Sequence, residues 1–189
     1  MKKGLNKEII TTKESRIKGY SKKEFYDFIK ENEYEKISHG IYASKDTFVD
    51  PLLVLKMRCP RAVASHDEAL YYFGLTDREP LKPTCTINSG YNASKLKKAG
   101  YKIYYVNNNL LDIGKTKVID NFGNEIYMYN LERTICDLIR NRNNFEVIEI
   151  SNALKKYLKR KDKNIDLLFK YAKVFSIDKI IFNYLSILL

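Results

Sequence analysis

The sequence is poor in the residues that build metal centres and disulfide frameworks. It has no tryptophan, two histidines and three cysteines among 189 residues. The cysteines are odd in number and far apart, so they match neither a disulfide framework nor a CxxC metal pair. We expect buried, reduced thiols at Cys59, Cys85 and Cys136. No HExxH, Walker A or GxGxxG motif occurs. The sequence therefore predicts no metal and no cofactor.

Long apolar runs are also missing. No uninterrupted apolar stretch reaches the ~18 residues that a membrane-spanning helix needs. The first ten residues, MKKGLNKEII, have a basic start without an apolar region behind it, so they do not resemble a secretory signal. These absences predict a cytoplasmic protein without a membrane partner.

Positive charge is what the sequence has in excess. Lysine and arginine number 34 against 23 aspartates and glutamates, a net charge of +11, and 44% of the residues are hydrophobic, enough for a core. Such an excess favours a polyanionic partner, most commonly nucleic acid. The alternative is a coding bias toward lysine, asparagine and isoleucine, which would make part of the charge incidental.

Short helices are predicted at the start of the chain. We expect two before Gly19, the first of them ending at Ile10. Ser21 and Glu24 then form an S-x-x-E capping box for a third helix over residues 22–30. On an ideal helix this segment places aromatic and aliphatic side chains on one face and three lysines with a tyrosine on the other.

A β-hairpin is predicted directly after this basic helix. Residues 35–38 and 40–43 suit two short strands with His39-Gly40 at the turn. Two helices, a basic helix and a hairpin follow one another in the order of a winged helix-turn-helix. We therefore predict a winged helix-turn-helix DNA-binding domain over residues 1–46.

The candidate DNA contacts fall on three parts of this domain. The second helix would hold phosphates, the basic helix would face the major groove, and the hairpin would touch flanking phosphates. In that order, the candidates are Lys13, Arg16 and Lys18; Ser21, Lys22, Lys23, Tyr26 and Lys30; and Lys36 and His39. The alternative is that these lysines merely solvate a surface helix, because acidic residues are interspersed with them.

Residues 47–189 predict a second, mixed domain. Asp50-Pro51 suits a helix start, residues 83–89 and 101–107 suit strands, and a hairpin turn is expected at residues 121–123. The last third is helical, and its final helix carries an apolar stripe at helical spacing. The predicted fold class is therefore α/β (α+β): a winged helix-turn-helix followed by a mixed sheet-and-helix domain with a helical tail.

Two clusters hold residue types that enzymes use. In Ser65-His66-Asp67-Glu68, we interpret Ser65 as a helix cap. In the second cluster, Glu132-Arg133-Thr134 with Asp137, the i,i+4 spacing of Arg133 and Asp137 predicts a local ion pair. No spacing forces carboxylates to converge on metal ions, so we predict no catalytic residue and no enzyme.

A second basic surface is a further hypothesis. Its candidate residues lie on two predicted helices, where they suit either a helix C-terminus or a polyanion. They are Lys95, Lys97, Lys98, Lys155, Lys156, Lys159, Arg160 and Lys161.

With these motifs in place, the chain resembles the AbiEi antitoxins of type IV toxin–antitoxin and phage-defence systems. The resembling blocks are GYSKKEFYDFIKENEYEKISHGIYA, PRAVASHDEALYYFGLTD, GNEIYMYNLERTICDLIR and ISNALKKYLKRKDKNIDLLFKYAKVF, spread over nearly the whole chain. The resemblance implies an autorepressor whose winged helix binds operator DNA with inverted repeats. It also implies a C-terminal domain that counteracts a nucleotidyltransferase-like toxin without needing a stable complex.

This chain departs from the pattern in carrying lysine where arginine would suit the basic helix and hairpin. Lysine cannot make the bidentate guanine contact that arginine makes, so phosphate binding is favoured over base readout. Three alternatives stay open: a stand-alone winged-helix regulator, a nucleic-acid-processing enzyme using His66, Glu132 or Asp137, and an interaction module that docks through its apolar final helix.

Overall fold

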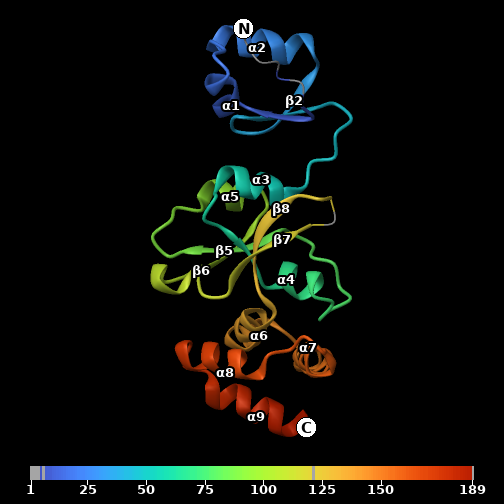
Figure 1. The fold of residues 1–189 in the computed structure, drawn as a ribbon, viewed down its shortest axis with the longest axis vertical. Helices are drawn as coiled ribbons and strands as arrows, with labels where there is room; N and C mark the ends of the chain where they lie inside the picture. The colour runs from blue at the N-terminus through green and yellow to red at the C-terminus, as the bar shows by residue number, and fades with distance from the viewer. Residues whose placement is uncertain (1–4, 6, 121, 189) are drawn as a thin grey trace. The chain divides into compact units, whose positions relative to one another are not determined.

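A computed structural model describes residues 5, 7–120 and 122–188, which form helices and two sheets (Figure 1). The mixed α/β fold class is thereby confirmed. The chain divides into two compact units, Met1–Arg58 and Cys59–Leu189. The predicted boundary lies after residue 46, whereas the first unit continues through the helix over Pro51–Arg58. No helix among the described residues is long and apolar enough to cross a membrane.

The first unit is built on a small three-stranded antiparallel sheet. Its strand order is β1-β3-β2, with β1 paired to the hairpin strand β3. The elements of this unit are β1 (Ile9–Thr11), α1 (Thr12–Ile17), α2 (Lys22–Glu31), β2 (Tyr34–Ser38), β3 (Ile41–Ser44) and α3 (Pro51–Arg58). A four-residue connection containing Gly19 joins α1 to α2, as in helix-turn-helix motifs.

Helix α2 forms as its sequence predicts. The Ser21 side chain accepts a hydrogen bond from the Glu24 amide at 3.3 Å, and the Glu24 carboxylate accepts one from the Ser21 amide at 2.8 Å. This capping box satisfies donors that the first turn of a helix leaves free. The apolar face of α2 buries Phe25 and Ile29 against Ile10.

The first predicted helix is wrong for the described residues near its end. Ile9 and Ile10 lie in β1, opposite Ala43 and Tyr42 of β3. Ladder pairing with a strand more than 30 residues away overrides the local pattern there. The earlier residues 4 and 6 of that prediction lie outside the described residues.

The tip of the hairpin is fixed to the start of α1. The Thr12 amide donates to the Gly40 carbonyl at 2.9 Å. Gly40 has a φ of +71°, and a Cβ there would lie 2.7 Å from the Thr12 hydroxyl oxygen. Glycine is therefore required at this turn, and the hairpin tip and the start of α1 form one rigid corner.

The second unit contains a five-stranded mixed sheet in the order β6-β5-β4-β8-β7. Its strands and the elements between them are β4 (Val63–Ala64), α4 (Asp67–Tyr72), β5 (Thr84–Asn88), α5 (Ser94–Lys98), β6 (Lys102–Val106), η1 (Asn108–Leu110), β7 (Lys115–Ile119) and β8 (Glu125–Tyr129). The predicted strands over residues 83–89 and 101–107 are confirmed as β5 and β6. Asn121 of the predicted hairpin turn lies outside the described residues.

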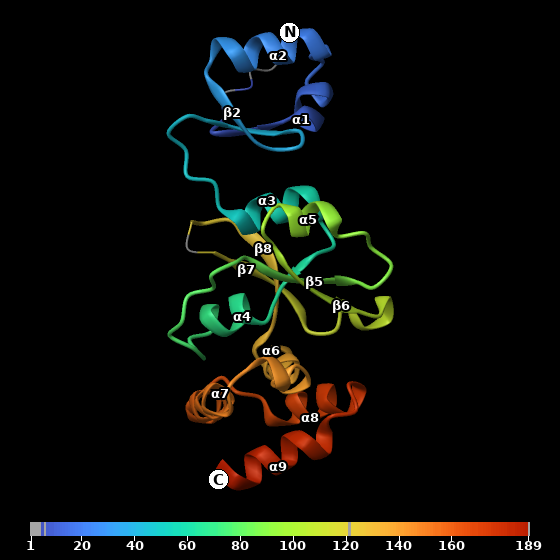
Figure 2. The ribbon, with the colours of Figure 1, turned by 180° about the vertical axis from the view of Figure 1, so that it is seen from behind.

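A helical layer follows the sheet in the chain and lies beyond one of its faces, opposite the face that carries α5 (Figures 1 and 2). It consists of α6 (Leu131–Arg140), η2 (Arg142–Asn144), α7 (Val147–Lys159), α8 (Ile165–Val174) and α9 (Asp178–Leu188). The predicted cap of α6 is confirmed, because the Asn130 side chain accepts from the Arg133 amide at 3.0 Å.

The apolar stripe of the final helix packs inside this layer. Ile177, Ile181 and Leu185 are buried in the same core cluster as Leu138 and Leu154. The stripe that suggested a docking helix is thus largely covered by the protein's own core. Of the large apolar side chains of α9, Phe182 and Ile187 remain exposed.

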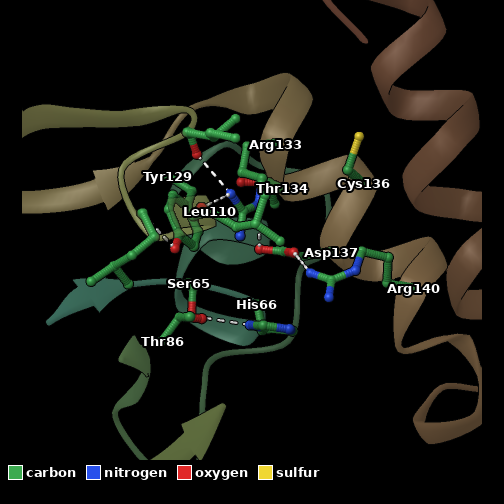
Figure 3. Close-up of polar contacts among 12 residues, drawn as sticks. Ser65, His66, Thr86, Leu110, Tyr129, Arg133, Thr134, Cys136, Asp137 and Arg140 are labelled. Atoms are coloured by element: carbon green, nitrogen blue, oxygen red, sulfur yellow. Dashed lines mark hydrogen bonds and ion pairs between the residues drawn. The ribbon is translucent and has the colours of Figure 1, made fainter. Parts of the chain in front are cut away.

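One buried arginine joins the sheet to the helical layer. Arg133 of α6 is fully buried and lies beside Tyr129 (Figure 3). Its guanidinium carbon lies 4.0 Å from the centre of the Tyr129 ring and 4.2 Å from that of the Phe175 ring. Its Nη1 donates to the carbonyls of Leu110 at 3.0 Å and Ile113 at 2.7 Å. Arg133 therefore holds the loop before β7, the end of β8 and the end of α8 together.

We expect Gly114→Ala to destabilise the protein more than Gly123→Ala. Both glycines have positive φ, +74° and +80°, but a Cβ at Gly114 would lie 2.5 Å from the Arg133 Cβ, while one at Gly123 meets nothing within 4 Å. The additional loss of stability for Gly114→Ala should be about 1–3 kcal/mol, the range for overpacking a core. Urea unfolding of both variants measures it, and equal losses would contradict the packing assigned to Arg133.

Candidate functional site

Six of the ten predicted DNA contacts line one hollow of about 270 Å³ in the first unit. We call it the basic hollow. It lies between α1, the start of α2 and the hairpin, and the predicted contacts around it are Arg16, Ser21, Lys22, Tyr26, Lys36 and His39. Three separate elements thus bring their cationic side chains to one place.

No acidic residue is among the described residues that line the basic hollow. Within the described part of the chain, Arg16, Lys22 and Lys36 form no ion pair, and all three are exposed. The nearby acid Glu14 is used elsewhere, since it pairs with Lys7 at 2.8 Å and with Lys18 at 3.7 Å. The hollow therefore has an uncompensated positive charge, which an anion would neutralise.

The remaining predicted contacts lie outside the hollow. Lys13, Lys23 and Lys30 are exposed on α1 and α2, while Lys18 is partly buried in its pair with Glu14. Ser21 lines the hollow, although its oxygen already serves as the cap of α2.

A tyrosine pair forms part of the hollow, and one of its members, Tyr42, was not among the predicted contacts. Tyr42 of β3 is buried and donates to the hydroxyl oxygen of the exposed Tyr26 at 3.5 Å. This hydrogen bond, together with burial, raises the pKa of Tyr42 to about 12. With Tyr42 as donor, the Tyr26 hydroxyl keeps its own hydrogen for an anionic acceptor. The only indication of Tyr42 in the sequence was the alternating pattern of side chains that predicted its strand.

The predicted second basic surface splits into two parts. Lys95, Lys97 and Lys98 lie on α5, whereas the other five residues lie at the end of α7 or just after it, on the opposite side of the sheet (Figure 2). On the α7 side, Lys156 pairs with Asp77 at 2.8 Å and Arg160 pairs with Asp162 at 2.8 Å. The structure therefore does not form one continuous surface from these eight residues.

The Ser65–His66 cluster is a buried polar chain, and Ser65 is not the cap of α4 as predicted. His66 occupies the N-cap position, and the Ser65 hydroxyl lies 2.8 Å from that of Thr86 and 3.0 Å from His66 Nδ1 (Figure 3). The His66 ring stacks on Tyr104 with centres 3.4 Å apart. Local sequence could not show this, because Thr86 and Tyr104 come from β5 and β6.

The hydrogen bonds fix the tautomer of His66. The Asn141 side-chain nitrogen lies 3.0 Å from both the Asp137 carbonyl and His66 Nε2. A carbonyl needs a donor, so this atom is the amide nitrogen, and His66 Nε2 is an acceptor. His66 Nδ1 then carries the proton and donates it to Ser65. A general base would need the reverse polarity, so this pair does not activate Ser65 as a nucleophile.

The second cluster is also used structurally. Asp137, predicted as half of a local ion pair, is buried and accepts from Arg133 Nε at 3.1 Å and from Arg140 Nη1 at 3.1 Å. Glu132 is buried too, and it accepts the Asn164 amide at 2.9 Å and the Tyr157 hydroxyl at 3.4 Å. The predicted ion pair is confirmed, and it is buried, with Arg133 also bonded to the loop before β7.

Metal and ligand chemistry is sparse elsewhere in the described residues. They include no group of three or more histidine, cysteine or acidic side chains that could hold a metal ion. All three cysteines are buried and free of disulfides. A hollow of about 360 Å³ beside α4 and α7 mixes charges of both signs, including the pairs Lys102–Asp67 and Arg78–Glu149.

The fold is similar to that of the RV2827C protein from Mycobacterium tuberculosis, known from a crystal structure. The TM-score is 0.64 at 10% sequence identity, and the match covers 89% of this chain and 67% of that chain. At this identity the likeness shows the mixed α/β fold alone. No protein-family model matches the chain, and no curated protein matches it.

We expect His66 to make stability fall in mild acid. Burial lowers its pKa from 6.5 to about 4, although the nearby carboxylates of Asp137 and Asp67 oppose the shift. The unfolded chain therefore binds a proton between these pH values that the folded chain does not bind. The free energy of unfolding should then drop by up to about 3 kcal/mol as the pH falls from 7 to 4.

Urea unfolding of wild type and His66→Asn across this range isolates the effect. The variant keeps every other titrating group, including His39, so the difference between the two profiles belongs to His66. Parallel profiles would contradict a buried neutral imidazole.

Proposed function

We propose that the chain is a cytoplasmic DNA-binding antitoxin that represses its own operon. In this proposal the first unit is a winged helix-turn-helix that binds double-stranded operator DNA. The second unit counteracts a nucleotidyltransferase-like toxin. The DNA-binding part is supported by geometry, and the antitoxin part rests on the resemblance to AbiEi antitoxins.

The observation that carries the DNA-binding proposal is the basic hollow. Arg16, Lys22 and Lys36 converge from α1, α2 and β2 around a lining whose described residues include no acid. Surface cations that merely solvate a helix are free to pair with nearby acids, as Lys18 does with Glu14. Unpaired cations from three elements around one hollow suit a phosphate of a nucleic-acid backbone.

The dimensions of α2 support a place in the major groove. Its ten residues give a rod about 15 Å long, and a major groove about 12 Å wide admits a helix. Its apolar face is buried, and its opposite face exposes Lys22, Lys23, Tyr26 and Lys30. The strand order β1-β3-β2 and the hairpin after α2 suit the winged version of the motif.

The type of cation favours backbone binding over base reading. Arg16 is the one arginine among the ten candidate contacts. Lysine contacts a phosphate as a point charge, whereas arginine reads guanine with two parallel hydrogen bonds. Sequence preference would then come from the positions of the phosphates, that is, from the shape of the operator.

The AbiEi-like blocks of the second unit have structural roles. Ser65 and His66 hold β4 to β5 and α6, while Arg133 and Asp137 hold α6 to the sheet. In this proposal these buried residues keep the fold of the second unit fixed, and its surface contacts the toxin or the toxin's target. The reversed polarity of the His66–Ser65 bond favours this role over the enzyme alternative.

We expect Arg16→Ala/Lys22→Ala/Lys36→Ala to weaken binding to DNA from upstream of the gene. For each phosphate that the variant no longer neutralises, the slope of log affinity against log salt should become shallower by about 0.9. Fluorescence anisotropy at several salt concentrations measures both quantities.

A charge-matched control is Lys155→Ala/Lys159→Ala/Lys161→Ala, which removes three positive charges from the second unit. It should keep the affinity and the salt slope of the wild type. Equal losses of affinity in both variants, or an affinity that salt does not change, would refute the basic hollow as the DNA site.

The same hollow variant should separate repression from antitoxicity. We expect it to lose repression of a reporter under the upstream region, yet still restore growth to cells that express the adjacent toxin, because the second unit is intact. Growth curves and reporter levels measure the two outcomes. Repression by the wild type without any protection from a toxin would instead identify a stand-alone regulator.

A further inference from the structure

One stretch of the second unit is basic, rich in tyrosine and free of acids. Residues 80–111 contain five lysines and four tyrosines but no aspartate or glutamate. In a chain where 23 acidic residues are spread over 189 positions, this segment is the source of a local charge excess. It includes β5, α5, β6 and η1.

The fold places this segment at one edge of the sheet. Strand β6 is the outer strand, and its alternate residues face opposite sides. Tyr104 stacks on His66 on the side of the helical layer, whereas Tyr105 faces α5. Lys97 of α5 holds its ammonium 5.1 Å from the centre of the Tyr105 ring. An aromatic ring and a cation thus share one corner of the unit.

The lysines of α5 have no counter-charge. Lys95, Lys97 and Lys98 are exposed, and none forms an ion pair within residues 5, 7–120 and 122–188. Lys95 and Lys98 lie at i,i+3 on this five-residue helix, so their ammonium groups repel each other, and a bound polyanion would relieve that repulsion. By contrast, Lys156 of α7 is neutralised within the protein by its ion pair with Asp77.

Groups that could contact bases lie on the same acid-free segment as these cations. Tyr105 is 43% exposed and Tyr91 is 39% exposed. Three exposed asparagines, residues 107–109, follow β6 directly; the Asn108 side-chain oxygen accepts from Arg61 at 2.8 Å, while Asn107 and Asn109 offer amide donors and acceptors. Exposed rings beside lysines are the usual means of binding unpaired bases, because every base has a face for stacking and a phosphate for the cation.

We infer that this α5–β6 surface, formed by Lys95, Lys97, Lys98, Tyr105 and Asn107, binds single-stranded nucleic acid. Bases in a duplex are stacked on each other and present no free face to Tyr105. The surface therefore selects unpaired strands, whereas the basic hollow of the first unit is proposed to bind a duplex. This second activity goes beyond the proposed function and does not depend on it.

The test uses the full chain and labelled 12-nucleotide strands of one sequence, as RNA, as DNA and as the DNA duplex. The wild type should bind the single strands. Tyr105→Ala should weaken this binding by about fivefold or more, and Tyr105→Phe should keep it, since the ring supplies the stacking. Lys95→Ala/Lys97→Ala/Lys98→Ala should make the salt slope shallower by about 0.7 for each phosphate that the variant no longer neutralises.

Two matched variants keep the result specific. Lys155→Ala/Lys159→Ala/Lys161→Ala removes the same charge elsewhere and should leave single-strand binding unchanged. Arg16→Ala/Lys22→Ala/Lys36→Ala should lose duplex binding alone, which separates this inference from the proposed function.

Each outcome either supports the inference or overturns it. Tighter binding of RNA than of the DNA strand identifies RNA as the source of the strand, and equal binding identifies any unpaired strand; both support the inference. Absence of single-strand binding at low salt, an unchanged affinity in Tyr105→Ala, or an equal loss of affinity in the α7 control overturns it.

Discussion

The second unit depends on the buried ion pair between Arg133 and Asp137. Desolvation offsets much of the attraction in such a pair, so its main effect is on which arrangement is allowed. Any shift of α6 along the sheet would leave the Asp137 charge or the two loop carbonyls without a partner in a dry interior. Tyr129 and Phe175 enclose the guanidinium from the sheet and from the helical layer. One side chain therefore sets how the two layers align.

The net charge of +11 is distributed unevenly over the molecule. Many lysines and arginines meet an acid, as Lys102 does with Asp67 and Lys117 with Glu125. Among the lysines and arginines that have no such pair in the described part of the chain, two groups lie beside tyrosines: those around the basic hollow and those on α5. A coding bias toward lysine accounts for isolated unpaired charges such as Lys23 and Lys159, but it does not explain cations that gather beside tyrosines. The local arrangement, rather than the total, points to polyanions.

The sequence predicted those elements that depend on interactions between residues close together in the chain. The Ser21–Glu24 capping box, the strands β5 and β6 and the Asn130 cap were predicted because each depends on residues close in sequence. The strand β1 was missed because its partner β3 lies 30 residues away. The hollow could not be foreseen as a cavity, since it exists only where the hairpin tip packs on Thr12. The burial of Asp137 likewise depends on the loop before β7, which is distant in sequence, so the i,i+4 spacing with Arg133 could not predict it.

The two outer strands of the large sheet share a feature that bears on self-association. Both strands carry lysine, Lys102 on β6 and Lys115 and Lys117 on β7, while the inner strands β5, β4 and β8 carry none. The free edge of a sheet is a template on which another chain can add a strand, and a lysine there must lose its hydration when that happens. The charged side chains at these edges thus act against aggregation, even though Lys102 and Lys117 each pair with an acid of the same unit. Replacing Lys102 by an apolar residue would therefore favour fibre-like strand pairing between copies of the protein.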